Sequence, residues 1–330
     1  MSSKQSLAIL GAGSWGTAVA IALAEQGHHV VLWTKNAAHY QDMQTKRCNE
    51  RYLPHNPFPP SLTCSMQLDD CVAQATHVLI AVPSHAFSEL LTAMPQPKAG
   101  LAWLTKGVDP DSCQVLSELV KRRWGNNYPT AVISGPSFAR EVASGLPTAL
   151  VVASLHPIYQ QQIQDLLHTS SLRVYLSDDV VGVQLCGALK NILAIACGIS
   201  DGIGYGANAQ AALITRGLAE MRRFLQAYDA RSETCLSLAG VGDLILTCTD
   251  NQSRNRRFGL LVGQGLDLQT AEKNIGQVVE GKYNAGQIHT LAQEHQIDMP
   301  ICAEVYAVLS QQRSPQEAVI RLMNRPAKEE

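Results

Sequence analysis

The first part of the chain alternates short apolar runs with segments of helical period. Each run contains four or five residues, which suits buried strands, and the segments between them are long enough for crossover helices. This alternation predicts an α/β fold with a parallel sheet and helices on its faces. The predicted strands are residues 7–10, 30–33, 77–81, 101–104, 130–134 and 149–153. The first crossover helix is expected at residues 18–25 and ends at Gly27.

From about residue 180 onward, strand-like runs become rare and the pattern favours successive helices. We therefore predict an α/β domain over residues 1–185, followed by an all-α domain over residues 186–330. Because no Gly/Ser-rich linker separates them, we expect a helix to lead directly from one to the other. The Pro-rich passage at residues 54–60 is expected to be an irregular surface excursion. The predicted helices are residues 181–199, 208–225, 285–294 and the stretch after Arg254.

Composition adds few constraints and removes several classes of protein. A chain of 330 residues with 46% hydrophobic and 16% charged residues is a globular protein large enough for two domains. The formal net charge of −2 does not favour binding to nucleic acid or to an anionic membrane. Nine dispersed cysteines without a CxxC pair predict reduced thiols, no disulfide framework and no metal site.

One segment imitates a secretion signal. Residues 7–24 carry no charge and end in Ala-Leu-Ala, but Gly11, Gly13 and Gly16 interrupt the run where a signal peptide needs continuous apolar helix. No other stretch is apolar and long enough to span a bilayer. We expect a cytoplasmic protein without membrane insertion.

A glycine loop joins the first predicted strand to the first predicted helix. In Gly11-Ala-Gly13-Ser-Trp-Gly16, the first glycine suits the tight turn. The second lets a pyrophosphate approach the backbone, and the third lets the helix pack on the strand. The helix N-terminus then offers free N–H groups to the phosphates. This G-x-G-x-x-G spacing between a strand and a helix predicts a Rossmann-type dinucleotide site.

The second predicted strand ends without the acidic residue that usually holds the ribose 2′-hydroxyl of NAD. Lys35 stands there instead and could meet a 2′-phosphate, so we expect NADPH as well as NADH to be accepted. The competing interpretation is a solvated loop lysine. Lys35 lacks the bidentate fork of an arginine, so the preference between NADP and NAD stays open.

Two other lysines are candidates for chemistry. Lys190 has only small or apolar helical neighbours, and in a cleft wall desolvation would lower its pKa and suit it to proton transfer. Asn191 beside it can hydrogen-bond a substrate oxygen. Lys106 follows a predicted strand, at the sheet edge where α/β proteins bind ligands. Gly135-Pro-Ser137-Phe-Ala139 follows the next strand. An ordinary surface lysine is the alternative for each of the two.

The helical part contains an anion-binding pattern. Ser253 is predicted to be a helix N-cap, so Arg254 and Asn255 would lie at a helix N-terminus, a combination that suits a phosphate group. A basic helix start on the surface is the alternative. Asp243, between glycines in Gly240-Val-Gly-Asp243, is either a site residue or a turn residue.

Seven motifs together resemble those of the soluble bacterial NAD(P)-dependent glycerol-3-phosphate dehydrogenases. They agree in order and approximate spacing from the first strand to about residue 310. The motifs are Gly11-Ala-Gly-Ser-Trp-Gly16, Leu104-Thr-Lys106-Gly107, Ser134-Gly-Pro-Ser-Phe-Ala139, Leu189-Lys190-Asn191, Gly240-Val-Gly-Asp243-Leu, Ser253-Arg254-Asn255 and Gln277-Val-Val-Glu280-Gly281.

The resemblance implies reversible conversion of dihydroxyacetone phosphate and NAD(P)H to sn-glycerol 3-phosphate, for phospholipid synthesis. Lys190 would be the general acid/base, and Lys106 would orient the substrate and stabilise alkoxide charge. The implied substrate-binding residues are Lys106, Gly135, Ser137, Lys190, Asn191, Asp243, Thr247, Ser253, Arg254 and Asn255. The implied cofactor-binding residues are Gly11, Gly13, Ser14, Trp15, Gly16, Lys35, Lys106, Ala139, Arg254, Val278 and Glu280. A homodimer through helical surfaces is compatible with the sequence.

Without the resemblance, two other functions remain open. A 6-phosphogluconate or β-hydroxyacid dehydrogenase also joins a Rossmann domain to helices and uses a lysine followed by asparagine. A non-catalytic dinucleotide sensor is the second alternative. The phosphate-binding pattern at Arg254 and the acid Asp243 favour a small phosphorylated triose.

Overall fold

The computed structural model describes residues 4–326. The chain forms two compact units. The first extends to Asp109 and resumes over Gln114–Val183, and the second consists of Pro110–Cys113 and the chain from Gln184 onward. The division within helix α8 (Val180–Ile203) lies two residues before the predicted boundary at 185/186. The short Pro110–Cys113 excursion was not predicted.

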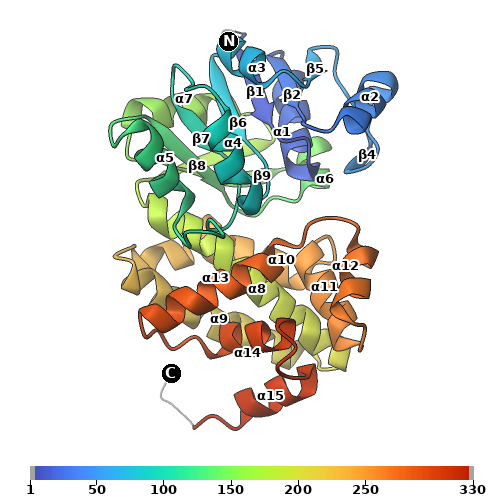
Figure 1. The fold of residues 1–330 in the computed structure, drawn as a ribbon, viewed down its shortest axis with the longest axis vertical. Coiled ribbons are helices and arrows are strands. Elements are labelled where there is room, and N and C mark those ends of the chain that lie inside the picture. Colours follow the sequence, from blue (N-terminus) through green and yellow to red (C-terminus); the bar gives the residue numbers. More distant parts are fainter. Residues whose placement is uncertain (1–3, 327–330) are drawn as a thin grey trace. The chain divides into compact units, whose positions relative to one another are not determined.

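The first unit is an eight-stranded sheet with helices packed on it (Figure 1). The strand order is β10-β9-β8-β7-β6-β1-β2-β5. Its strands are β1 (Ser6–Leu10), β2 (His29–Trp33), β5 (Leu62–Ser65), β6 (His77–Ile80), β7 (Leu101–Trp103), β8 (Thr130–Ser134), β9 (Thr148–Ala153) and β10 (Leu172–Ser177). Its helices are α1 (Ser14–Glu25), α2 (Ala37–Lys46), α3 (Leu68–Gln74), the 3-10 turn η1 (Ser84–Ala86), α4 (Phe87–Ala93), α5 (Leu116–Trp124), α6 (Ala139–Ala143) and α7 (Pro157–Leu167).

Strand β1 lies inside the sheet, between β2 and β6 and parallel to both. Leu10 is level with Trp33 on one side and Ile80 on the other, so the carboxyl ends of the three strands meet at one edge. Alternate side chains serve opposite faces. Leu7 and Ile9 join the buried core with α1, α6 and α7. The glycine loop after β1 therefore follows a strand that is buried on both faces.

All six predicted strands are present, and three features differ from the prediction. First, β9 runs antiparallel to β8, because the five-residue helix α6 between them is too short, at about 1.5 Å per residue, to carry the chain back along the sheet. Second, β5 and β10 were missed. Third, the Pro-rich passage is not wholly irregular, since β4 (Leu53–Pro57) pairs with β3 (Cys48–Asn49).

The second unit is helical, as predicted (Figure 1). The helices predicted at 181–199, 208–225 and 285–294 correspond to α8, α9 and α13. Besides α8, the second unit contains α9 (Ala207–Ala227), the 3-10 turn η2 (Ser232–Leu236), the π-helical turn η3 (Leu238–Gly242), α10 (Asp243–Thr249), α11 (Arg254–Gly263), α12 (Leu268–Ile275), α13 (Glu280–Glu294), α14 (Pro300–Leu309) and α15 (Pro315–Met323).

Glycines allow α8 and α11 to cross with their backbones in close approach. A Cβ atom on Gly198 would lie 2.0 Å from the carbonyl oxygen of Arg256. A Cβ on Gly259 would lie 2.2 Å from the carbonyl oxygen of Ile195. Because any side chain would separate the two helices, this crossing brings the start of α11 against the middle of α8, where Lys190 and Asn191 lie.

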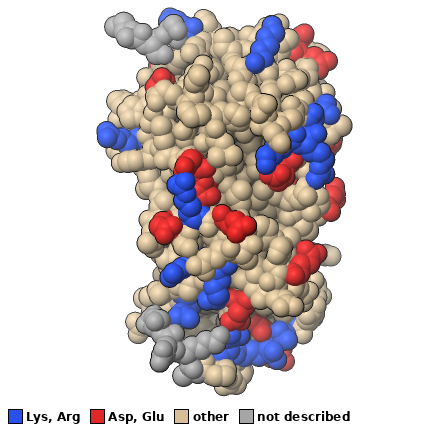
Figure 2. Space-filling model, turned by 90° about the vertical axis from the view of Figure 1, so that its left-hand side faces the viewer, with Lys and Arg blue, Asp and Glu red and all other residues tan. Residues whose placement is uncertain are grey.

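The expectation that no stretch beyond residues 7–24 is apolar and long enough to span a bilayer was wrong, since helix α8 meets that criterion by length and composition, with a mean hydropathy of 1.8. However, 94% of its apolar window is buried within the protein, as in the core helix of a soluble protein. On the face drawn in Figure 2, basic and acidic side chains are interspersed among other residues. That face carries no large patch of one charge, in keeping with the net charge of −2.

Helix α14 begins on a buried carboxyl group. Glu220 on α9 is 1% exposed, and its two carboxyl oxygens accept hydrogen bonds from the backbone N–H groups of Ile301 (2.6 Å) and Cys302 (3.1 Å). Burial raises the pKa of Glu220 from 4.5 to about 7, although these two N–H donors favour the ionised form.

The raised pKa makes stability depend on pH. Because the folded protein holds the Glu220 proton more tightly than the unfolded chain does, the contribution of this group to stability is full below the unfolded pKa near 4.5 and is lost as pH rises through 7. We predict that the unfolding free energy of the wild type falls by about 3 kcal/mol more than that of Glu220→Gln as the pH is raised from about 4 to about 8. Urea unfolding of both proteins at several pH values measures this. If the unfolding free energies of the two proteins changed in parallel with pH, the raised pKa of Glu220 would be contradicted.

Candidate active site

The predicted site residues divide between the two units. Those of the first unit lie along the carboxyl edge of the sheet: Gly11, Gly13, Ser14, Trp15, Gly16, Lys35, Lys106, Gly135, Ser137 and Ala139. Those of the second unit lie on or beside α8, α10, α11 and α13: Lys190, Asn191, Asp243, Thr247, Ser253, Arg254, Asn255, Val278 and Glu280.

Each glycine of the loop after β1 has surroundings that fit its predicted role. Gly11 has φ +126°, and a Cβ there would lie 2.8 Å from the carbonyl carbon of Ala81. A Cβ on Gly16 would lie 2.1 Å from the carbonyl oxygen of Gly11. By contrast, a Cβ on Gly13 would meet nothing within 4 Å. Gly13 therefore presents bare backbone to open space at the start of α1, which suits the approach of an anionic pyrophosphate.

The helix after this loop starts earlier than predicted, at Ser14 instead of residue 18, so the loop supplies its first turn. The Ser14 hydroxyl donates a hydrogen bond to the carbonyl oxygen of Tyr52 at 2.7 Å. The half-buried side chain of Trp15 packs on the core. The N-cap of α1 is Gly13, which has no side chain to cap the helix.

A second group in the first unit joins the ends of β7 and β8. The half-buried Lys106 donates from Nζ to the carbonyl oxygen of Gly135 at 3.2 Å. The Ser137 hydroxyl donates to the same carbonyl at 3.0 Å. Ala139 begins α6, which packs against α1. Lys106, Gly135 and Ser137 thus form one cluster, as their positions after neighbouring strands predicted.

Lys190 lies in the second unit as a buried cation. It is 7% exposed, and its Nζ donates to Asp243 Oδ1 at 2.6 Å and to Thr247 Oγ1 at 2.9 Å. Its helical neighbours on α8 are apolar, as predicted, and its polar partners come from α10. Asp243 and Thr247 are 1% and 4% exposed. The ammonium is therefore held by a carboxylate and a hydroxyl, which is an arrangement for proton transfer at a fixed point.

A π-helical turn places Asp243. Residues Leu238–Gly242 form this turn, whose N-cap, Ser237, accepts hydrogen bonds from the N–H groups of Ala239 and Gly240. Such π-helical segments are frequent at functional sites. Asp243 then starts α10, one helical turn before Thr247, and the Thr247 hydroxyl also donates to the carbonyl oxygen of Asp243 at 2.6 Å. Asp243 is thus buried at the first position of α10 and does not lie in a turn.

Asn191 and Asn255 link α8 to α11 and α13. The Asn255 amide donates to Asn191 Oδ1 at 2.9 Å, and Asn255 Oδ1 accepts from the N–H of Gly281 at 2.9 Å. The Asn191 amide approaches Glu280 Oε2 at 3.4 Å. Val278 lies two residues before Glu280, just before α13. These side chains converge on one small polar area beside Lys190.

The start of α11 has the predicted form. Ser253 is the N-cap and accepts from the N–H of Arg256 at 3.2 Å. Arg254 is half-buried and donates to Gln277 Oε1 at 3.2 Å. Arg256, two residues further along, binds Asp201 and the carbonyl oxygen of Cys248. Arg254 is therefore the arginine that fits an anion at this N-terminus.

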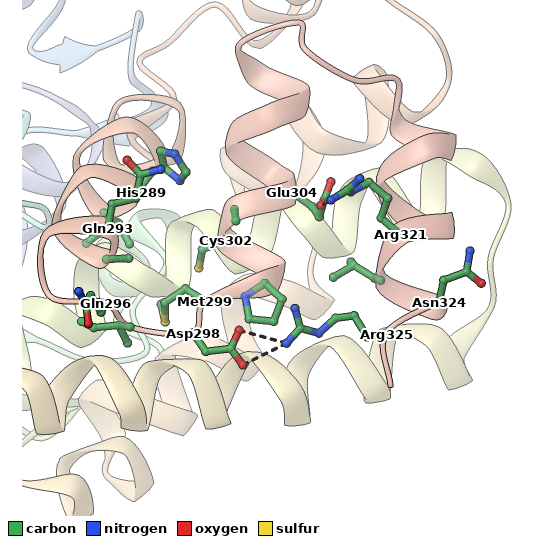
Figure 3. A pocket seen from close by; sticks show the side chains of 16 residues that line it. His289, Gln293, Gln296, Asp298, Met299, Cys302, Glu304, Arg321, Asn324 and Arg325 are labelled. Carbon is green, nitrogen blue, oxygen red and sulfur yellow. Dashed lines mark hydrogen bonds and ion pairs between the residues drawn. The ribbon is translucent and has the colours of Figure 1, made fainter. Parts of the chain in front are cut away.

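A cavity of about 680 Å³ elsewhere in the second unit contains none of the predicted residues (Figure 3). It lies among α13, α14 and α15. Asp298 and Arg325 form an ion pair across it at 3.0 Å, and Glu304 binds Arg321 at 3.1 Å. Within residues 4–326 no group of three or more His, Cys, Asp or Glu side chains could hold a metal ion. The nine cysteines are free thiols.

Sequence reasoning missed Asn49, which braces the glycine loop. This side chain is 0% exposed, and its amide donates to the carbonyl oxygen of Ala12 (3.0 Å) and to Thr17 Oγ1 (2.8 Å). Its Oδ1 lies 2.9 Å from Nε2 of His39. Asn49 is distant from the loop in sequence and belongs to no motif, so no local signal indicated it. Gln277, the partner of Arg254, was missed although it begins a recognised motif.

We predict that Asn49→Ala weakens dinucleotide binding. The substitution leaves the carbonyl of Ala12 without its buried donor and loosens the loop. We expect a loss of about 2 kcal/mol in unfolding free energy and an approximately tenfold weaker Kd for NADPH. Calorimetric titration and urea unfolding measure the two effects. The control is Asn56→Ala, since Asn56 bonds only locally, to the carbonyl oxygen of Pro54. Equal NADPH affinity in the two variants would show that the Asn49 side chain does not hold the glycine loop in its binding conformation.

Comparison with known proteins agrees with this arrangement. The family model described as the NAD-dependent glycerol-3-phosphate dehydrogenase N-terminus matches residues 6–159, and the corresponding C-terminus model matches residues 179–320. The glycerol-3-phosphate dehydrogenase [NAD(P)+] of Legionella pneumophila (strain Lens) is 60% identical over 327 residues, covering 99% of both chains. That of Klebsiella pneumoniae (strain 342) is 48% identical, covering 98% of this chain and 97% of the relative.

A solved structure shows the same likeness. The crystal structure of glycerol-3-phosphate dehydrogenase from Coxiella burnetii superposes with a TM-score of 0.94 at 48% identity. The match covers 98% of this chain and 99% of that one. The resemblance predicted from the seven motifs is confirmed, and the chain belongs to the NAD-dependent glycerol-3-phosphate dehydrogenase family.

Proposed function

We propose that this chain catalyses the reversible reduction of dihydroxyacetone phosphate to sn-glycerol 3-phosphate with NADPH or NADH. The observation that carries the proposal is the buried Lys190, held by Asp243 and Thr247, in a family whose relatives are named for this activity. A bound NAD(P)H would supply the hydride to C2 of the substrate. The C2 oxygen then needs one proton, which has to come from a residue of the chain.

Lys190 supplies that proton in the proposal. Its ammonium donates to the C2 oxygen as the hydride arrives, and in the oxidative direction the amine removes the hydroxyl proton. Asp243 and Thr247 hold the Nζ atom at one position through two hydrogen bonds. Lys106 serves as the cation that orients the substrate and offsets alkoxide charge.

The phosphate group of the substrate has its own proposed site. Arg254, Asn255 and the N-cap Ser253 combine a guanidinium, an amide and the N-terminal end of α11. Asn191 joins this group to Lys190 through its hydrogen bond from Asn255. This phosphate-binding group, together with the acid Asp243, favours a small phosphorylated triose over a larger acid such as 6-phosphogluconate.

The cellular setting follows from the same proposal. Eight of the nine free cysteines are buried, a pattern of thiols kept reduced, which supports a cytoplasmic location. The biosynthetic role in phospholipid synthesis is the one that the family resemblance implies. A homodimer through surfaces of the helical unit stays a prediction that is compatible with the sequence.

Replacement of the proposed proton donor tests this function. We predict that Lys190→Ala lowers kcat for dihydroxyacetone phosphate by at least about a thousandfold and changes the Kd for NADPH little, because the glycine loop is untouched. NADPH oxidation and calorimetric titration give the two quantities. Lys121→Ala, which removes an exposed lysine paired with Glu118, is the control. Near-normal turnover by Lys190→Ala, or faster wild-type turnover of 6-phosphogluconate, would refute the proposal.

A further inference from the structure

An ion pair crosses the sheet edge at the glycine loop. Lys35 Nζ lies 3.2 Å from Oε1 and 3.3 Å from Oε2 of Glu89, so both carboxylate oxygens face the ammonium. The two side chains are 68% and 71% exposed. Lys35 follows the end of β2, whereas Glu89 lies on α4, which follows β6. The pair therefore joins segments that are 54 residues apart in sequence.

The strand that separates these segments carries the glycine loop. Strand β1 lies between β2 and β6, and Leu10 is level with Trp33 and Ile80. Neighbouring strands are about 4.8 Å apart, so the ends of β2 and β6 are separated by roughly 10 Å. A dinucleotide whose pyrophosphate rests on Gly13 has its adenosine ribose near the end of β2. The ion pair spans this position.

We propose that Glu89 sets the cofactor preference of this enzyme. Its carboxylate accepts a hydrogen bond from the adenosine ribose 2′-hydroxyl of NADH and repels the 2′-phosphate of NADPH. NAD sites usually obtain this carboxylate from the end of the second strand, where this chain has Lys35. Glu89 delivers the same chemical group from α4. The inference rests on the proposed binding of NAD(P)H at the glycine loop.

The charges explain why one chain can accept both cofactors. Lys35 alone would favour the dianionic 2′-phosphate over a hydroxyl. Glu89, at 3.2 Å, compensates the lysine charge and competes with the phosphate for the ammonium. Because both side chains are exposed, solvent screening limits the effect, and it should weaken as ionic strength rises.

The test is Glu89→Gln, which keeps the shape of the side chain and removes its charge. Calorimetric titration of wild type and variant would use NADPH and NADH, and then the fragments 2′,5′-ADP and 5′-AMP. We expect the Kd for NADPH to fall on the order of fivefold while that for NADH stays equal or rises, with the fragments in parallel. At about 0.5 M salt the difference in the Kd for NADPH between Glu89→Gln and the wild type should shrink below about twofold. Glu118→Gln is the matched control, because Glu118 pairs with Lys121 on α5.

The outcomes separate the inference from the function on which it rests. An unchanged ratio of the two Kd values in Glu89→Gln, with both dinucleotides binding the wild type, would overturn the role of Glu89 alone. An equal change in Glu118→Gln would overturn it too, because the effect would then reflect net charge. Failure of the wild type to bind either dinucleotide would overturn the proposed function itself.

Discussion

The helical unit buries an ion pair between Lys190 and Asp243, and the fold has to compensate both charges. Burying two ions costs several kcal/mol each, and only a short, well-satisfied contact repays that cost. Here the contact is 2.6 Å, with Thr247 as a further partner of the ammonium. The neighbouring features serve this geometry: the apolar face of α8, the π-helical turn before Asp243 and the glycine contacts that bring α11 against α8. In the proposed reaction, these contacts hold the Lys190 ammonium where it would deliver its proton to one substrate atom.

In the first unit, the proposed contacts with the pyrophosphate come from the backbone of the glycine loop and not from side chains. Gly13 presents backbone without a side chain to open space, while Gly11 and Gly16 allow the loop to pack closely on the end of β6 and on α1. Asn49 fixes this loop from a distant part of the chain. The selectivity for the adenosine ribose is then left to exposed charges, Lys35 and Glu89, which can vary without disturbing the loop.

Much of this arrangement could be predicted from the sequence where the signal is local. The six strands, the glycine loop and the N-cap Ser253 follow from periodicity and spacing, and the seven motifs identified the family. Features that depend on distant residues could not be predicted. The reversal of β9 follows from the length of α6, the structural use of Arg256 depends on Asp201, and the partners of Asn49 and Glu89 lie 37 and 54 residues away. Lys190 was recognised from its apolar neighbours, but its ion pair required the position of α10.

The most direct test of this account is the pH profile of kcat/KM for dihydroxyacetone phosphate in Asp243→Asn, compared with the wild type. The account predicts a fall of at least about a hundredfold, with NADPH affinity unchanged, because the amide no longer holds or compensates the Lys190 ammonium. It also predicts that the alkaline limb of the profile moves to lower pH, since an ammonium without its carboxylate loses its proton more easily. A variant with the wild-type rate and an unshifted profile would show that the buried ion pair does not govern the proton transfer.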